Sequence, residues 1–146
     1  MGLGECARVS GKRKERAVRM PVPSSPCTIV LPSTESDTAS VCVSTDDEDA
    51  VAALLPAASA ALGPIGVLVN NASTFERDEW HDATRASWDR HMEPNLRAPF
   101  VLMQAFARAL PAQAEGVVLN LLDQRVWSLT PHFVSYTVSK AGLWTL

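Results

Sequence analysis

A tyrosine and a lysine close to the end of the chain, Tyr136 and Lys140, are four positions apart. On a helix this spacing places both side chains on one face. A free phenol has a pKa of ~10, and a cation within ~4–6 Å lowers that pKa by ~1–3 units. A phenol tuned in this way suits general acid or base work on a carbonyl or an imine. The same spacing also fits an ordinary surface helix, so the surrounding elements must be considered.

These elements alternate between strand and helix. Continuous apolar runs predict buried strands at residues 66–70 and 117–122, with a shorter strand at 41–43. Helical stretches are expected between and after them, over residues 45–62, 84–110 and from 133 onward. This alternation predicts βαβ units, in which helices cover both faces of a parallel sheet.

Local signals refine the predicted helices. Thr45 is expected to cap the first helix, with Gly63 ending it, and Thr84 is expected to cap the second. The second helix should be irregular near Pro94 and Pro99, because proline removes a helical hydrogen bond. Its second piece repeats apolar residues at helical spacing, namely Phe100, Met103, Phe106 and Leu110.

Polar residues follow the two main strands and occupy the helix break. Residues 70–73 come directly after the first strand, and Asn95 lies in the break. Tyr136 lies at the start of the helix that follows the second strand. Since open α/β sheets bind ligands at the carboxyl ends of their strands, we expect these groups to meet at one edge.

Three motifs in this order resemble the short-chain dehydrogenase/reductase family. They are Leu68–Ala72, Asn95–Phe100 and the Tyr136/Lys140 pair, and the resemblance covers roughly residues 41–146. It implies an α/β fold with a Rossmann-like, doubly wound parallel sheet. It also implies an oxidoreductase that uses NADP(H) in preference to NAD(H) to reduce a small-molecule substrate.

The resemblance also implies roles for single residues. Tyr136 is expected to donate a proton, Lys140 to lower the pKa of Tyr136 and bind the nicotinamide ribose, and Asn95 to hold a water of the proton relay. The residues assigned to the cofactor are Asn70, Ala72, Ser73, Leu121, Tyr136 and Lys140.

One departure from the family pattern points to a branch of it. The family places a serine thirteen residues before the tyrosine, where this chain has Asp123. Together with Phe75 after the Asn-Ala-Ser turn, this resembles the pteridine reductases, in which the carboxyl group assists the tyrosine and the aromatic ring stacks on a pterin. Asp123 in a dry pocket should have a raised pKa. The alternatives are that Asp123 only caps the following loop and that Phe75 fills the core.

Residues 1–40 lack the expected features of such a domain. They show no sustained period and are interrupted by prolines, so we expect an irregular, poorly ordered segment there and a partial domain over 41–146. No strand followed by a glycine-rich turn is found, so the sheet should lack its first βα unit, and its C-terminal strands also. We expect a truncated copy that is unstable or prone to aggregate. The alternative function is a non-catalytic fragment or interaction module without a cofactor cradle.

Composition narrows the remaining classes of function. The net charge of −3 argues against nucleic-acid binding, and the apolar runs are too short to span a membrane. The histidines lack a metal-binding pattern, so no metal is expected. An odd number of cysteines, three, indicates free thiols and a cytoplasmic location. The family resemblance implies a homo-oligomer.

Overall fold

The computed structural model describes residues 29–31, 43–45 and 47–146. Most of the strand predicted at 41–43, all three cysteines and most of the segment 1–40 lie outside these residues. The elements, in chain order, are β1 (Ile29–Leu31), α1 (Glu48–Leu62), β2 (Val67–Asn70), α2 (Arg85–Met92), the π-helix η1 (Glu93–Arg97), α3 (Ala98–Ala109), β3 (Val117–Asn120), the 3₁₀ turn η2 (Gln124–Val126) and α4 (Val134–Thr145).

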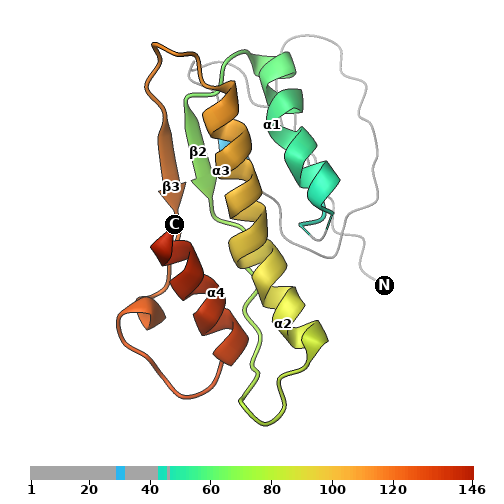
Figure 1. Cartoon of the computed structure of the whole chain (residues 1–146), viewed down its shortest axis with the longest axis vertical. Coiled ribbons are helices and arrows are strands. Elements are labelled where there is room, and N and C mark those ends of the chain that lie inside the picture. The colour runs from blue at the N-terminus through green and yellow to red at the C-terminus, as the bar shows by residue number, and fades with distance from the viewer. Residues whose placement is uncertain (1–28, 32–42, 46) are drawn as a thin grey trace, which may run out of the picture.

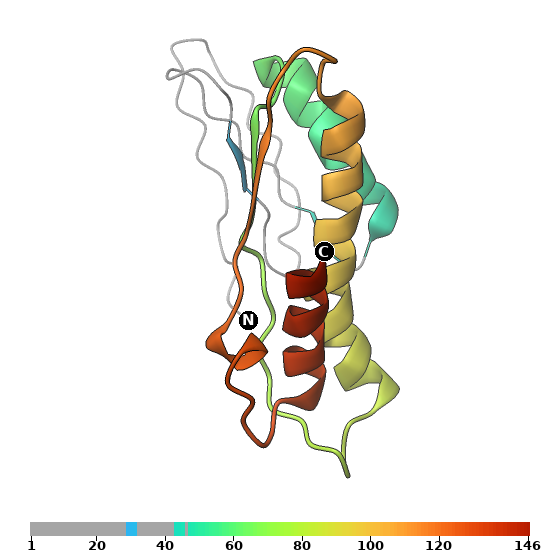
Figure 2. The same ribbon diagram turned by 60° about the vertical axis from the view of Figure 1, so that its left-hand side comes forward.

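The sheet has the strand order β1-β2-β3 (Figure 1). β2 and β3 are parallel, as predicted, and their last residues, Asn70 and Asn120, are paired. β1 differs from the parallel expectation, because it runs antiparallel to β2. The described helices lie on one side of these strands (Figure 2), so only one face of the sheet is covered by helices in this part of the chain. The arrangement is an α/β fold with an incomplete sheet.

The N-cap of the first helix is Asp47, two residues after the predicted cap, Thr45. Asp47 has an extended backbone, and its carboxylate accepts a hydrogen bond of 3.0 Å from the amide of Ala50. Thr45, the predicted cap, is instead buried, and its hydroxyl has no hydrogen-bond partner among the described residues. Gly63 ends the helix as expected, with a φ of 89° that L-residues with a side chain rarely adopt.

The core lies between α1, α3 and the sheet. It contains Val51, Leu54, Leu55, Ala58, Ile65, Leu68, Ala98, Val101, Leu102 and Phe106. Phe106 is thus the one fully buried member of the apolar face predicted for the second helix piece, while Met103 and Leu110 pack at the margin of the core. The buried face of α3 differs from the predicted one because α3 packs against α1, and this packing buries Val101 and Leu102.

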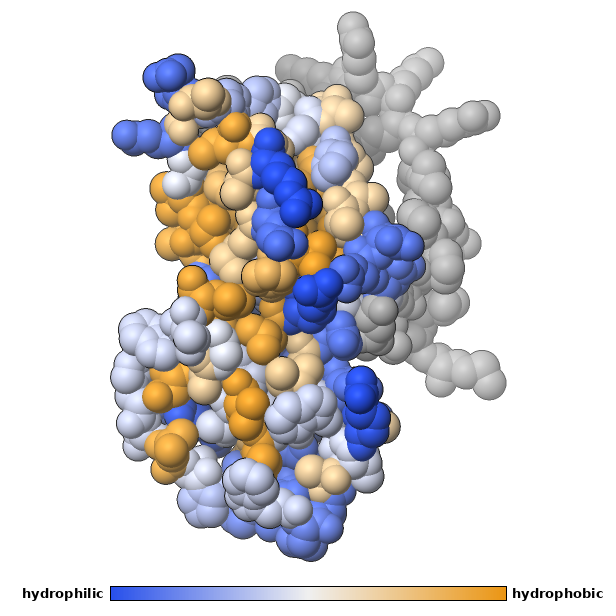
Figure 3. Space-filling model, in the orientation of Figure 1, coloured by the Kyte–Doolittle hydropathy of each residue, from blue (hydrophilic) through white to orange (hydrophobic). Residues whose placement is uncertain are grey.

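β3 is exposed, which contradicts the buried strand predicted from its continuous apolar run but agrees with a sheet expected to lack its C-terminal strands. Val117 and Leu119 are each about half exposed, at 49% and 50%. β3 pairs only with β2 in the described residues, and no described helix covers its outer face. Figure 3 shows the resulting apolar surface on the side of the molecule where β3 lies. Near the end of α4, Trp144 and Leu146 are also exposed, whereas Leu143 is buried.

Candidate active site

The predicted site residues converge where β2 and β3 end. The loop after β2 (residues 71–84), the loop after β3 (121–133), η1 and the first turns of α4 meet there (Figure 1). α4 and η1 approach closely because residue 142 is glycine: a Cβ at this position would lie 2.8 Å from a methyl carbon of Leu96. The edge predicted from the sequence is therefore the place where these side chains meet.

Tyr136 and Asp123 are in direct contact. The phenol donates a hydrogen bond of 3.0 Å to Oδ2 of Asp123. The other carboxylate oxygen accepts the amide of Arg125 at 2.9 Å, which makes Asp123 the N-cap of η2. One carboxylate oxygen of Asp123 therefore caps the turn, as one interpretation expected, and the other accepts the hydrogen bond of the phenol.

Asp123 has a lowered pKa, so the expectation of a raised one is wrong. The largest cause is the hydrogen bond from the backbone amide of Arg125. The phenol of Tyr136 and the guanidinium of Arg125 also lower this pKa, and burial opposes them. Desolvation alone would have raised the pKa and favoured the neutral acid, but three donors favour the carboxylate. Asp123 is therefore an ionised acceptor at neutral pH.

The pKa of Tyr136 is raised, whereas the sequence predicted that it would be lowered. Burial first, and then the hydrogen bond and the charge of Asp123, raise the pKa of the phenol to about 12. The predicted lowering by Lys140 is absent from its causes, because the ammonium group is directed elsewhere. Ser73 makes no well-formed hydrogen bond through its buried hydroxyl, yet it lies near enough to the phenol to reduce this rise. Tyr136 is therefore fully protonated at neutral pH.

Lys140 is buried one helical turn after Tyr136, as the spacing predicts. Its Nζ donates a hydrogen bond of 2.9 Å to the carbonyl of Leu121 and lies 6.0 Å from the centre of the Tyr136 ring. Burial lowers the pKa of the ammonium group, and the charge of Asp123 opposes this. An ammonium has three N–H groups, and this one has a single acceptor among the described residues, so it retains donors for an added oxygen.

Asn95 is completely buried in η1 and joins three segments. Its Oδ1 accepts the amide of Thr74 at 2.8 Å, and its Nδ2 donates to the carbonyl of Thr74 at 2.9 Å and to Oγ of Ser139 at 3.0 Å. The Ser139 hydroxyl in turn donates to the carbonyl of Tyr136. A π-helical turn often marks a functional position, and here it places this amide between the loop after β2 and α4.

The residues after β2 are held by the parallel strand pair. Asn70 donates from Nδ2 to Oδ1 of Asn120 at 2.8 Å, while its own buried Oδ1 has no partner among the described residues. Ala72 and Ser73 are half-buried beside it. The backbone amide of Leu121 donates to the carbonyl of Asn70, which fixes the carbonyl of Leu121 in front of Lys140.

Phe75 is not core filler, because half of its surface is exposed. Its ring stacks on Phe133 with centres 4.5 Å apart and meets the edge of Tyr136 at 4.6 Å. The guanidinium of Arg125 lies 5.1 Å from the centre of the Phe75 ring and 5.0 Å from that of Phe133. The sequence analysis assigned no role to Phe133 or Arg125, since neither belongs to a recognisable spacing.

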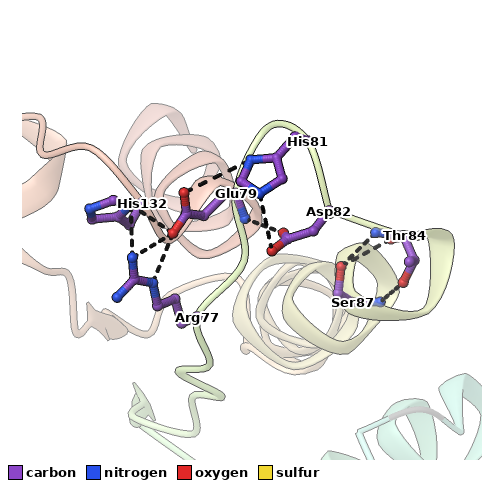
Figure 4. A network of polar contacts seen from close by, with 7 residues as sticks. All are labelled: Arg77, Glu79, His81, Asp82, Thr84, Ser87 and His132. Atoms are coloured by element: carbon purple, nitrogen blue, oxygen red, sulfur yellow. Dashed lines mark hydrogen bonds and ion pairs between the residues drawn. The ribbon is translucent and has the colours of Figure 1, made fainter.

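The histidines make ordinary hydrogen bonds. His91 is buried, accepts the amide of Glu76 through Nε2 and bonds the carbonyl of Ser87 through Nδ1. His132 lies in an exposed polar network with Glu79 and Arg77 (Figure 4). Within the described residues, no group of histidine, cysteine or acidic side chains could hold a metal ion, and no helix is long and apolar enough to cross a membrane.

Comparison with known proteins decides the family. Residues 23–146 match the model of the short chain dehydrogenases. The chain belongs to the short-chain dehydrogenase family. The match begins at residue 23, earlier than residue 41, where the resemblance inferred from the three motifs begins.

Individual members of the family agree with this assignment. The chain is 35% identical over 95 residues to the probable galactose dehydrogenase GalD of Rhizobium meliloti, covering 65% of this chain and 37% of the relative. A solved structure of FolM alternative dihydrofolate reductase 1 from Brucella canis, in complex with NADP, is 41% identical, with a TM-score of 0.71, covering 75% of this chain and 44% of that one. A metagenomic short-chain oxidoreductase in complex with NADP is 32% identical, with a TM-score of 0.69, covering 75% and 50%. The chain thus spans about half or less of the length of these relatives.

Proposed function

We propose that this protein is a reductase that uses NADP(H) to reduce a carbonyl or a pterin-like C=N bond. The observation that carries the proposal is the hydrogen bond between the phenol of Tyr136 and Asp123 at the ends of two parallel strands. Lys140 follows on the same helix face, and Asn95 is hydrogen-bonded to Ser139, which lies between them in α4. In this proposal Tyr136, Lys140, Asp123 and Asn95 form the catalytic group.

The protonation states favour the reductive direction. A phenol whose pKa is raised to about 12 carries its proton throughout the neutral range and can give it to a substrate atom that has just gained electrons. Oxidation would need the phenolate as base, and a phenolate beside the ionised Asp123 is electrostatically unfavourable. The same repulsion favours rapid reprotonation of Tyr136 after each turnover.

The residues around Lys140 fit a nicotinamide cofactor, which would supply the hydride. The ammonium group has unused donors for ribose hydroxyls, and the buried Oδ1 of Asn70 is an unpaired acceptor at the same sheet edge. Backbone groups of Ala72, Ser73 and Leu121 would line the rest of the proposed cofactor site. NADP(H) rather than NAD(H) is supported by the FolM and metagenomic structures, both of which are complexes with NADP.

Replacing Lys140 by Met should weaken the binding of NADPH by at least about tenfold, because one charge-assisted hydrogen bond contributes about 1.5–3 kcal/mol. Titration of the purified protein, followed by cofactor fluorescence, measures the change. Arg108→Met removes an exposed cation from α3 and is the matched control, for which affinity should stay unchanged. A wild-type protein that binds neither NADPH nor NADH would contradict the proposed function and favour a non-catalytic interaction module.

Phe75 and Asp123 support a planar, nitrogen-containing substrate. The exposed ring of Phe75 lies beside the Tyr136 phenol, where a flat heterocycle could stack and still reach the proton donor. Asp123 accepts from that phenol and could equally accept an N–H group of the heterocycle. FolM is itself described as an alternative dihydrofolate reductase.

An Asp123→Ser variant should therefore lose activity toward a dihydropterin by about tenfold or more relative to a simple ketone, since serine cannot supply the negative acceptor. Initial rates of NADPH consumption with both substrates give the ratio. Asp82→Ser, in the exposed loop after β2, is the control. An unchanged ratio of the two rates would remove the pterin assignment and leave carbonyl reduction.

Homo-oligomeric assembly and a cytoplasmic setting complete the proposal.

A further inference from the structure

The helix that carries Tyr136 and Lys140 has no N-cap of its own. Phe133 occupies the cap position of α4, and no side chain of the helix's own N-terminal turn caps it. Both His132 and Phe133 have a left-handed backbone, with φ of 73° and 58°, which is unusual for residues other than glycine. A helix start of this kind requires stabilisation from elsewhere in the structure.

Asp78, in the loop after β2, supplies that stabilisation. Its carbonyl accepts the amides of Phe133 at 2.8 Å and Val134 at 3.4 Å, and its carboxylate accepts the amide of Ser135 at 3.1 Å. The Ser135 hydroxyl donates to the second carboxylate oxygen. Three consecutive amides at the helix start, which ordinarily lack partners, are thus bound by one residue far away in the sequence. The negative carboxylate also complements the positive end of the helix dipole.

The same carboxylate connects α4 to α2. Ser87, which forms the capping box of α2 with Thr84, has its Oγ 3.4 Å from Oδ2 of Asp78, and the same hydroxyl lies 3.1 Å from the carbonyl of Thr84, so the two acceptors share one donor. Figure 4 shows Ser87 and Thr84 at the start of α2, with the loop that contains Glu79 and Asp82 passing beside them. Asp78 and Ser135 are buried, so water does not compete for these bonds. The start of α2 therefore lies against the carboxylate that binds the start of α4.

We infer that Asp78 is a positioning residue, which fixes the start of α4 and thereby holds Tyr136 against Asp123. Tyr136 directly follows Ser135, so a shift at the helix start moves the phenol with it. The inference rests on the proposed role of Tyr136, yet its structural content can be measured without any turnover. No part of Asp78 touches the phenol, and its effect passes through the backbone of α4.

The chain contains a single tyrosine, so the absorbance of phenolate reports Tyr136 alone. In Asp78→Ala we expect the pKa of Tyr136 to fall from about 12 by about one unit or more toward the free value of ~10, because the loosened helix start hydrates the phenol and separates it from Asp123. In Asp78→Asn, which keeps an acceptor for the Ser135 amide, the pKa should stay close to that of the wild type. Asp49→Ala, at an exposed position of α1, is the matched control and should leave the pKa of Tyr136 unchanged.

Hydrogen exchange separates a local change from global unfolding. Amides of α4 should exchange about tenfold faster in Asp78→Ala, while those of α1 and α3 keep their protection. Should Asp78→Ala fail to fold, Ser135→Ala removes only the hydroxyl contact, and faster exchange confined to α4 is again expected.

Wild-type values of both the Tyr136 pKa and α4 exchange in Asp78→Ala would overturn the inference, as would unchanged α4 exchange in Ser135→Ala if Asp78→Ala does not fold. Failure of the proposed function would appear differently, as a Tyr136→Phe variant with full activity, and it would leave these measurements as expected. Asp123→Asn provides the positive control for the titration, since removal of the adjacent charge must lower the phenol pKa.

Discussion

Replacing Tyr136 by Phe should lower turnover by about 10²–10⁴-fold, because the substitution removes the proposed proton donor and little else. The ring contacts with Phe75 and His91 remain available to phenylalanine. The lost hydrogen bond to Asp123 is partly compensated by the remaining donors from Arg125, so the free energy of unfolding should change by about 1 kcal/mol or less. Turnover should therefore fall sharply in this variant, while the free energy of unfolding should hardly change.

Initial rates of NADPH consumption with a dihydropterin and with a ketone measure the loss, and denaturant unfolding measures stability. Thr137→Val is the matched control: it removes a buried hydroxyl from the adjacent position of α4, and that hydroxyl has no hydrogen-bond partner in the described residues. Turnover within about twofold of the wild type in Tyr136→Phe would show that the proton comes from another group.

Substitution of Asn95 by Ala should destabilise the protein by about 2–4 kcal/mol. The fully buried amide side chain binds the amide and carbonyl of Thr74, which is half-buried, and the buried hydroxyl of Ser139. Each buried polar group left without a partner costs about 1–3 kcal/mol, which is a large fraction of a typical total of ~5–15 kcal/mol. The loop after β2 should separate from η1, so cofactor affinity should decrease as well.

Denaturant unfolding at equilibrium measures this effect, with NADPH titration as a second readout. Asn71→Ala is the control, since it removes an identical side chain from an exposed position in the same region, and it should change stability by about 0.5 kcal/mol or less. Equal stabilities of the two variants would show that the Asn95 hydrogen bonds contribute nothing net.

The sequence predicted the elements that position the site because their signals are local. The apolar run that ends at Asn70, the threonine cap at Thr84 and the proline-marked break around Asn95 all correspond to features of the structure. The Tyr136/Lys140 spacing likewise placed both residues on one buried helix face. Their meeting at one edge followed from the general geometry of parallel strands.

What sequence reasoning could not supply depends on contacts between distant segments. The pKa directions of Asp123 and Tyr136 were predicted incorrectly, because the amide that ionises Asp123 belongs to a turn whose conformation no spacing reveals. The exposure of β3 depends on which elements flank it, and the capping of α4 by Asp78 joins positions 57 residues apart. A continuous apolar run identifies a strand, but it does not identify what covers that strand.

The hydrogen bond from Lys140 to the carbonyl of Leu121 makes the position of the ammonium group depend on the outermost strand, β3. Leu121 directly follows β3, which is held on one side by β2 and is open on the other in the described residues. Fraying of this outermost strand would withdraw the acceptor from Lys140 without any change in α4. Whatever shields the outer edge of β3 would consequently hold this acceptor in front of Lys140 and steady the ammonium group from a distance.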